Sequence, residues 1–199
     1  MAKRDPLIAF VKKRIEDSIQ TKRKLLGQSA AVVAIANVLV GAVRAGRKII
    51  FFGNGGSAAD AQHLAAELVG RFYSDRRPLP ALALTVDTSA LTAIGNDYSF
   101  DQVFARQLEA LGEAGDVAVG ITTSGNSANV LEALRVGRRK GIVTVALTGR
   151  TGGKARDEAD YCLPVPSNDT PRVQESHILL GHILCEVVER AVLSETSPE

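Results

Sequence analysis

Residues 48–72 constrain the fold more than any other part of the chain. They begin with an apolar run at 49–52 that ends in glycine, which is typical of a central strand in a parallel sheet. The turn that follows, Gly-Asn-Gly-Gly at 53–56, permits positive φ and a close approach of a ligand to the backbone. Ser57 then occupies the expected N-cap of a helix, where free N–H groups and the helix dipole attract an anion. These residues therefore predict a strand, a phosphate-binding turn and a helix in succession.

The same helix carries His63 and Glu67, which project from one face because they are four residues apart. A lone histidine at this position would more often be a core or surface residue than a ligand. The pair instead predicts an acid/base or metal site, because it lies beside a phosphate-binding turn and a distant helix offers a second histidine, His182.

Composition sets broad limits on the fold and on the partners. With 199 residues the chain is long enough for one well-buried α/β domain and too short for two. The net charge of +2 is small and its basic residues are scattered, and aromatics make up only 5%, so a nucleic-acid surface is not expected. Cys162 and Cys185 fit core thiols in a reducing compartment. No signal peptide and no apolar run of roughly 18 residues are apparent, so we expect a cytoplasmic protein without a membrane span.

Two helices are expected before the sheet. Asp5 caps the first, Pro6 opens it, and an apolar stripe lies opposite a heavily charged face. The second, at 29–44, is apolar on nearly every side, which indicates burial all round. We interpret residues 1–45 as an oligomerisation element and favour a homo-oligomer over a monomeric helical layer.

From Lys48 onward, strands and helices alternate, which predicts right-handed crossovers onto a parallel sheet with helices on both faces. The expected class is therefore α/β, a three-layer sandwich around a central parallel five-stranded sheet, in a single domain at 1–199 whose sandwich occupies 46–195. The expected strands are 49–53, 81–86, 117–122, 143–148 and 161–165, and the expected helices are 57–72, 100–111, 126–140, 153–159 and 171–193.

A second loop between a strand and a helix is rich in hydroxyls: Thr122, Thr123, Ser124 and Ser127. Such a loop binds oxyanions, although it could equally be a turn that caps its helix through Asn126 or Ser127. Two such loops favour a phosphorylated ligand, and the lack of a nucleotide signature favours a phosphosugar. The segment 86–98 is expected to be a loop, in which Asn96 and Asp97 form either a turn or hydrogen-bond partners for a polyol.

Five motifs in one order carry a resemblance to a known family: Gly-Asn-Gly-Gly-Ser at 53–57, Asp-x-x-His-x-x-x-Glu at 60–67, Gly-Asn-Asp at 95–97, Thr-Ser-Gly-Asn-Ser at 123–127 and Val-Gln-Glu-x-His at 173–177. Together they resemble the sugar-isomerase (SIS) domain family, and within it the phosphoheptose isomerases. The resemblance covers nearly the whole chain. It implies a flavodoxin-like sandwich, a homotetramer with active sites at subunit contacts, and one zinc ion per subunit near the sugar.

The resemblance also implies roles for individual residues. Helix geometry would place Glu175, rather than Gln174, on one stripe with His182, and only the family pattern prefers Gln174. For His177 a structural or ligand-supporting role is expected. The implied metal ligands are His63, Glu67, Gln174 and His182; the implied substrate contacts are Asn54, Gly55, Gly56, Ser57, Glu67, Asn96, Asp97, Thr122, Thr123, Ser124, Ser127 and Gln174.

The implied reaction converts sedoheptulose 7-phosphate to D-glycero-D-manno-heptose 7-phosphate through an enediol, the first step toward ADP-heptose or GDP-heptose. Such a proton transfer needs a base and an acid, for which Glu67 and His182 are the candidates. The alternative is a non-catalytic SIS-domain scaffold that binds the DnaA replication initiator, but that relative lacks a carboxylate and a histidine at positions 67 and 182. A phosphosugar-sensing regulator is a third reading, which the absence of a helix-turn-helix in the first 45 residues disfavours.

Overall fold

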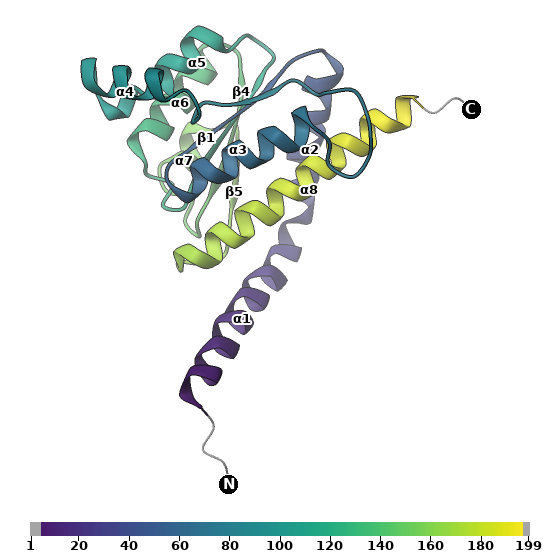
Figure 1. The fold of residues 1–199 in the computed structure, drawn as a ribbon, viewed down its shortest axis with the longest axis vertical. Coiled ribbons are helices and arrows are strands. Elements are labelled where there is room, and N and C mark those ends of the chain that lie inside the picture. The colour runs from purple at the N-terminus through teal and green to yellow at the C-terminus, as the bar shows by residue number, and fades with distance from the viewer. Residues whose placement is uncertain (1–4, 197–199) are drawn as a thin grey trace.

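The computed structural model describes residues 5–196 and has an α/β fold with a central sheet between two layers of helices (Figure 1). All five strands are parallel, in the order β2-β1-β3-β4-β5. The predicted three-layer sandwich is therefore confirmed. The strands are β1 (Ile49–Gly53), β2 (Ala81–Ala83), β3 (Val117–Thr122), β4 (Val143–Thr148) and β5 (Tyr161–Pro164).

Each face of the sheet carries its own hydrophobic core. One core joins the sheet to α2, α3 and α8 through residues such as Leu39, Leu64 and Leu184. The other joins it to α5 and α6 through Leu108 and Leu134. The helical elements are α1 (Pro6–Leu25), η1 (Leu26–Gln28), α2 (Ser29–Arg44), α3 (Gly56–Val69), α4 (Thr88–Asp97), η2 (Phe100–Gln102), α5 (Ala105–Leu111), α6 (Ala128–Arg139), α7 (Ala155–Glu158) and α8 (Thr170–Thr196).

The strand order places the two predicted loops next to each other. Strand β1 pairs with β2 on one side and with β3 on the other, with Gly53 opposite Ile121 at their carboxyl ends. The order of the sheet reverses at this point, and ligands of open α/β sheets bind at the carboxyl ends of strands beside such a reversal. The turn after β1 and the hydroxyl-rich loop after β3 therefore flank the expected ligand position.

The segment 86–98 corrects the prediction of a loop, because most of it forms helix α4. Asp87 caps this helix, and its side chain accepts a hydrogen bond from the Ala90 N–H at 2.9 Å. Asn96 and Asp97 form the last turn of the helix rather than a free turn. The Asp87 carboxylate thus caps a helix that continues through Gly95. Strand β2 is also shorter than predicted, because it ends at Ala83 rather than at residue 86.

Helix α1 begins as predicted, with the Asp5 side chain accepting a hydrogen bond from the Leu7 N–H at 2.9 Å. It extends away from the α/β body (Figure 1). Its apolar stripe is uncovered in the single chain, and Ile8, Val11 and Ile15 are 55%, 49% and 57% exposed.

Helix α2 is expected to be buried all round with the help of a partner subunit, and this stays a prediction because the structure holds one chain. It packs against α8 with one face only, which includes Ile35, Leu39 and Val43. Its other face is open within one chain, where Val33 is 57% exposed.

By length and hydropathy alone, the helical stretch Pro6–Arg44 could cross a membrane, although 39% of its most apolar window is buried in the protein. The sequence-based expectation that the chain has no membrane span stays a prediction, because this test uses length and composition only. Core helices pass the same test, and one face of α2 belongs to the core that covers the sheet. The stretch is weak evidence for a membrane span.

Candidate active site

The turn after β1 leads directly into helix α3. Gly55 is the N-cap, with a φ of 55°, a conformation that favours glycine. This corrects the prediction of Ser57 as the cap. Ser57 lies in the first turn of α3, where it is buried and its N–H donates to the Asn54 carbonyl at 3.0 Å.

Gly56 lies directly under the side chain of Gln174. A Cβ added at Gly56 would stand 2.5 Å from the Nε2 of Gln174, which is too close for the two groups to coexist without movement. The start of α8 is therefore packed against the start of α3, and the Gln174 amide reaches the phosphate-binding turn.

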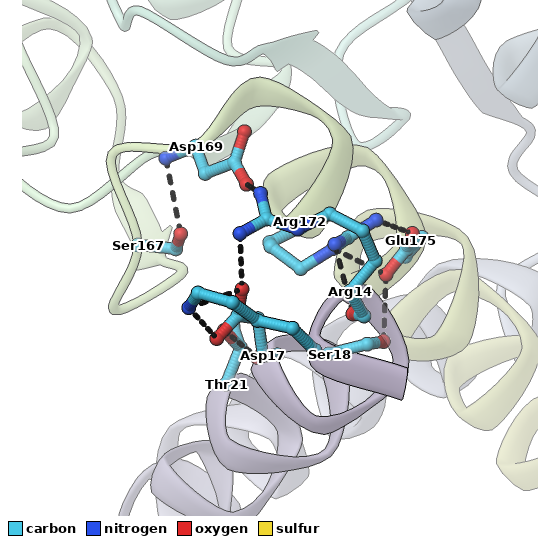
Figure 2. Close-up of polar contacts among 9 residues, drawn as sticks. Arg14, Asp17, Ser18, Thr21, Ser167, Asp169, Arg172 and Glu175 are labelled. Atoms are coloured by element: carbon cyan, nitrogen blue, oxygen red, sulfur yellow. Dashed lines mark hydrogen bonds and ion pairs between the residues drawn. The ribbon is translucent and has the colours of Figure 1, made fainter. Parts of the chain in front are cut away.

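Glu175 points toward helix α1, where it meets Ser18 (Figure 2). Its carboxylate pairs with Arg172 and accepts a hydrogen bond from the Ser18 hydroxyl at 2.6 Å. Arg172 also donates to the Arg14 carbonyl at 3.0 Å. Helix geometry alone did not decide whether Gln174 or Glu175 faces the site. In the structure, Gln174 faces α3 and Glu175 binds α1.

His63, Glu67 and His182 come together where α3 and α8 lie side by side (Figure 1). One ligand atom from each residue lies within 4.8 Å of the other two. The two Nε2 atoms are 2.8 Å apart, and Nε2 of His63 is 3.2 Å from Oε1 of Glu67. Glu67 and His182 are thus within mutual reach in one chain, as the catalytic interpretation requires.

This donor set fits zinc. Two imidazole nitrogens and one carboxylate oxygen are common zinc ligands, and tetrahedral bonds of ordinary length hold ligand atoms about 3.3 Å apart. Three protein ligands from this cluster leave one position of a tetrahedral ion open. Asp60 lies one turn before His63, and its Oδ2 is buried without a hydrogen-bond partner. Burial raises the pKa of Asp60 despite the nearby imidazoles of His63 and His182, which lower it.

The hydroxyls of the loop after β3 converge. The Thr122 hydroxyl lies 3.0 Å from that of Ser127 and 3.4 Å from that of Ser124. Ser127 stands at the N-cap of α6 but makes no capping hydrogen bond with its side chain, and the Asn126 side chain binds the Ser124 carbonyl and the Lys154 N–H. The loop is therefore more than a turn that caps its helix. Thr123, next in the loop, is half-buried.

A pair of amides joins the two loops. Asn54 and Asn129 exchange two hydrogen bonds, of 2.9 Å and 2.8 Å. Asn129 is buried at 3% exposure in the first turn of α6. Sequence reasoning missed Asn129; the only signal was a polar residue on the inner face of α6. The pair uses one of the two N–H groups of the Asn54 amide, so the second remains for a ligand.

Asn96 and Asp97 lie apart from the other predicted residues. They are exposed at the carboxyl end of α4, and Asn96 donates to Asp97 at 2.8 Å. Within residues 5–196, no hydrogen bond or ion pair joins them to either loop or to the histidines. Their membership of the site stays a prediction.

His177 is a buried residue of α8, with its Nε2 3.0 Å from the Thr148 carbonyl. Burial lowers its pKa to about 4, although the hydrogen bond to the carbonyl raises it. It is therefore neutral at pH 7 and binds the end of β4, as a structural role requires.

The sequence and the fold were compared with those of known proteins. The family model for the SIS domain matches residues 14–149, which include both loops and the His63–Glu67 pair. A phosphoheptose isomerase from Neisseria gonorrhoeae has the same fold, with a TM-score of 0.88, 47% identity, and coverage of 92% of this chain and 99% of that one. One from Francisella tularensis gives a TM-score of 0.89 and 37% identity, and the alignment covers 92% and 98% of the two chains. The fold and the paired loops are thus those of a SIS domain.

Relatives with similar sequences identify a narrower group within the SIS domain family. A phosphoheptose isomerase of Aquifex aeolicus is 55% identical over 187 residues, which cover 94% of this chain and 98% of that one. One of Aneurinibacillus thermoaerophilus is 53% identical over 186 residues, covering 92% and 94%. The chain belongs to the SIS domain family and, within it, to the phosphoheptose isomerases, and it is therefore an enzyme that interconverts an aldose and a ketose.

Proposed function

We propose that this enzyme converts sedoheptulose 7-phosphate to D-glycero-D-manno-heptose 7-phosphate through an enediol. The observation that carries the proposal is the convergence of His63, Glu67 and His182 within 4.8 Å, beside two loops that suit a phosphate. The relatives named above are phosphoheptose isomerases, which supports a seven-carbon sugar phosphate as the substrate.

Glu67 acts as the base in this proposal. It removes a proton from C1 of the ketose while a proton from His182 reaches the C2 oxygen, which gives the enediol. Glu67 then returns its proton to C2, and His182 takes the proton of the C1 hydroxyl as the aldehyde forms. The carboxylate has two oxygens, so one can contact the cation while the other faces the sugar.

His63, Glu67, Gln174 and His182 would hold one zinc ion in each subunit. When bound, zinc would polarise the sugar carbonyl as a Lewis acid. The chain's own groups bind and orient the substrate: Ser57, Thr122, Thr123, Ser124 and Ser127 offer hydroxyls to the phosphate and sugar, and Asn54, Gly55 and Gly56 offer the N-terminus of α3.

The active unit in this proposal is a cytoplasmic homotetramer with its sites at subunit contacts. Two observations support it: α1 exposes an apolar stripe, and Asn96 and Asp97 do not reach the other site residues in one chain. We further propose that the product supplies ADP-heptose or GDP-heptose for lipopolysaccharide or a related surface glycan.

Incubating the purified protein with sedoheptulose 7-phosphate and measuring heptose 7-phosphate tests the proposal. We expect conversion that stops with a chelator and returns with zinc. No conversion by the zinc-loaded protein would refute it. The scaffold alternative predicts capture of the DnaA initiator instead; the relatives and the intact Glu67–His182 pair do not favour it.

A further inference from the structure

We infer that the buried ion pair of Arg76 and Glu189 positions His182 and Glu67 for their role in the site. The inference rests on the proposed function, because it assigns these two residues a task in the site described there. Neither Arg76 nor Glu189 belongs to either loop or to the cluster of His63, Glu67 and His182. Both would be positioning residues that act through their neighbours.

Glu189 holds the segment that follows α3. Its carboxylate accepts hydrogen bonds from the N–H groups of Phe72, Tyr73 and Ser74 at 3.0, 2.8 and 3.1 Å. It also accepts from Nε of Arg76 at 3.1 Å. The two charged side chains are only 2% and 3% exposed, so four charge-assisted hydrogen bonds are made out of contact with water. Residues 72–76 are thereby fastened to α8.

Arg76 holds the end of α3 from the other side. Its guanidinium donates to the carbonyl of Glu67 at 2.9 Å and to that of Leu68 at 2.9 Å. The last carbonyls of a helix have no partner within the helix, and a cation there also complements the helix dipole. Arg76 therefore fixes the last turn of α3, which carries Glu67.

Phe72 connects this clamp to His182. The two ring centroids are 5.8 Å apart, and the rings are tilted by 45°. Glu189 lies seven residues after His182 on α8, which is two turns along the same face. The segment 72–76, which Glu189 holds, therefore lies beside α8, and the ring of Phe72 contacts the imidazole of His182. The ion pair of Arg76 and Glu189 therefore fixes two things: the Phe72 ring that packs against His182, and the backbone of Glu67.

A purely structural role is the competing explanation. A buried ion pair is weak evidence for stability, because its desolvation cost offsets much of the attraction between the charges. What distinguishes this pair is its set of partners, which includes the backbone of one site residue and the ring that packs on another. The experiment must therefore separate loss of stability from loss of position.

The test compares Glu189→Gln with the matched control Asp116→Asn. Asp116 is 1% exposed; it accepts from the N–H groups of Lys48 and Glu113 at 3.0 and 2.8 Å and pairs with the Lys48 ammonium at 2.7 Å. It directly precedes β3, at the amino ends of the strands and away from the two loops at their carboxyl ends. We expect both variants to lower the midpoint of urea unfolding, and only Glu189→Gln to weaken zinc binding, by about 10- to 100-fold in chelator competition.

Phe72→Leu provides a second variant that keeps the ion pair. It retains an apolar side chain but removes the flat ring beside His182. We expect the same weakening of zinc binding with a smaller loss of stability. Zinc affinity equal to wild type in both Glu189→Gln and Phe72→Leu would overturn the inference.

Failure of the proposed function would give a different result. If the wild-type protein neither binds zinc nor converts the sugar, the proposed function fails, and the inference is then judged on the metal-free protein. Nuclear Overhauser contacts between the rings of Phe72 and His182 are expected in wild type and Asp116→Asn and expected to be lost in Glu189→Gln. Their persistence in Glu189→Gln would overturn the inference.

Discussion

The Nε2 atoms of His63 and His182 lie 2.8 Å apart, although 119 positions separate the two residues in the chain. A neutral imidazole has one donor and one acceptor nitrogen, so one of these rings can donate to the other only in suitable tautomers. Two protonated rings would repel each other. A cation placed between them would accept both lone pairs, and Oε1 of Glu67, 3.2 Å from the His63 nitrogen, would complete a third contact.

Glu67→Gln is expected to lower kcat by about 10²- to 10⁴-fold, because the amide cannot act as the base. The substitution keeps the size of the side chain, so the two loops and their hydroxyls should stay in place. Steady-state kinetics measure the loss of turnover. Calorimetry should still detect binding of the phosphosugar, because the loops that hold its phosphate are unchanged. A variant that retains most of its turnover would exclude Glu67 as the base.

His63→Ala is expected to weaken zinc binding by at least 10-fold, since it removes one of the three converging ligand atoms. His63 is exposed on α3, with 48% of its side chain accessible, so the fold should tolerate the change. Competition with a fluorescent chelator measures the affinity. Gln62→Ala, at the neighbouring exposed position, is the control and should bind zinc as wild type does.

The sequence was sufficient for the central strands β1 and β3, because they are apolar runs that are buried on both faces. It was misleading for α4, where Asp87 supplies a cap that turns an apparent loop into a helix. It also misplaced the N-cap of α3, since the cap is Gly55, with a positive φ, two residues before the expected Ser57. Local capping chemistry thus decided the boundaries that periodicity could not.

The site was predictable where residues share one element and less so where two elements meet. The spacing of His63 and Glu67 indicated a common face. The choice between Gln174 and Glu175 could not be made from α8 alone, because it depends on α1, which engages Glu175 through Ser18. The amide pair of Asn54 and Asn129 was invisible for the same reason: its partners are 75 positions apart.

Acid is expected to destabilise the protein between about pH 6.5 and pH 4 through His177. Its pKa falls from 6.5 to about 4 on folding, so in this interval the unfolded chain binds a proton that the folded chain does not. Stability is therefore lost as the pH falls, by roughly 3 kcal/mol when pH 4 is reached. Urea unfolding of the metal-free protein at pH 7 and pH 5 measures the effect.

The chain has three histidines, which gives this measurement a clean background. In the double variant His63→Gln, His182→Gln, only His177 remains, and the loss between pH 7 and pH 5 should persist. If unfolding in that background were independent of pH across the interval, apart from the titration of carboxylates, His177 would not be the group responsible.

Ile15→Glu is expected to break the proposed homotetramer into smaller species. Ile15 lies in the exposed apolar stripe of α1, and a charge there would be buried without a partner in an assembled interface. Sedimentation velocity measures the assembly. Gln20→Glu adds the same charge to another face of α1 and should leave the assembly intact. A monomeric wild type, or an Ile15→Glu variant that assembles normally, would contradict the proposed role of residues 1–45.

Gly56→Ala tests whether the contact between α3 and α8 serves the site. The added Cβ would stand 2.5 Å from the Nε2 of Gln174, so the amide must move away from the phosphate-binding turn. We expect kcat/KM to fall at least 10-fold, and Gln174→Ala to cost a similar amount. Combining the two should cost little more than either alone, because both remove the same placement of one amide. Gly27→Ala, where a Cβ would meet nothing within 4 Å, should leave kinetics unchanged. Fully additive losses in the double variant would show that Gly56 and Gln174 act independently. The contact with α3 would then not be what positions the Gln174 amide.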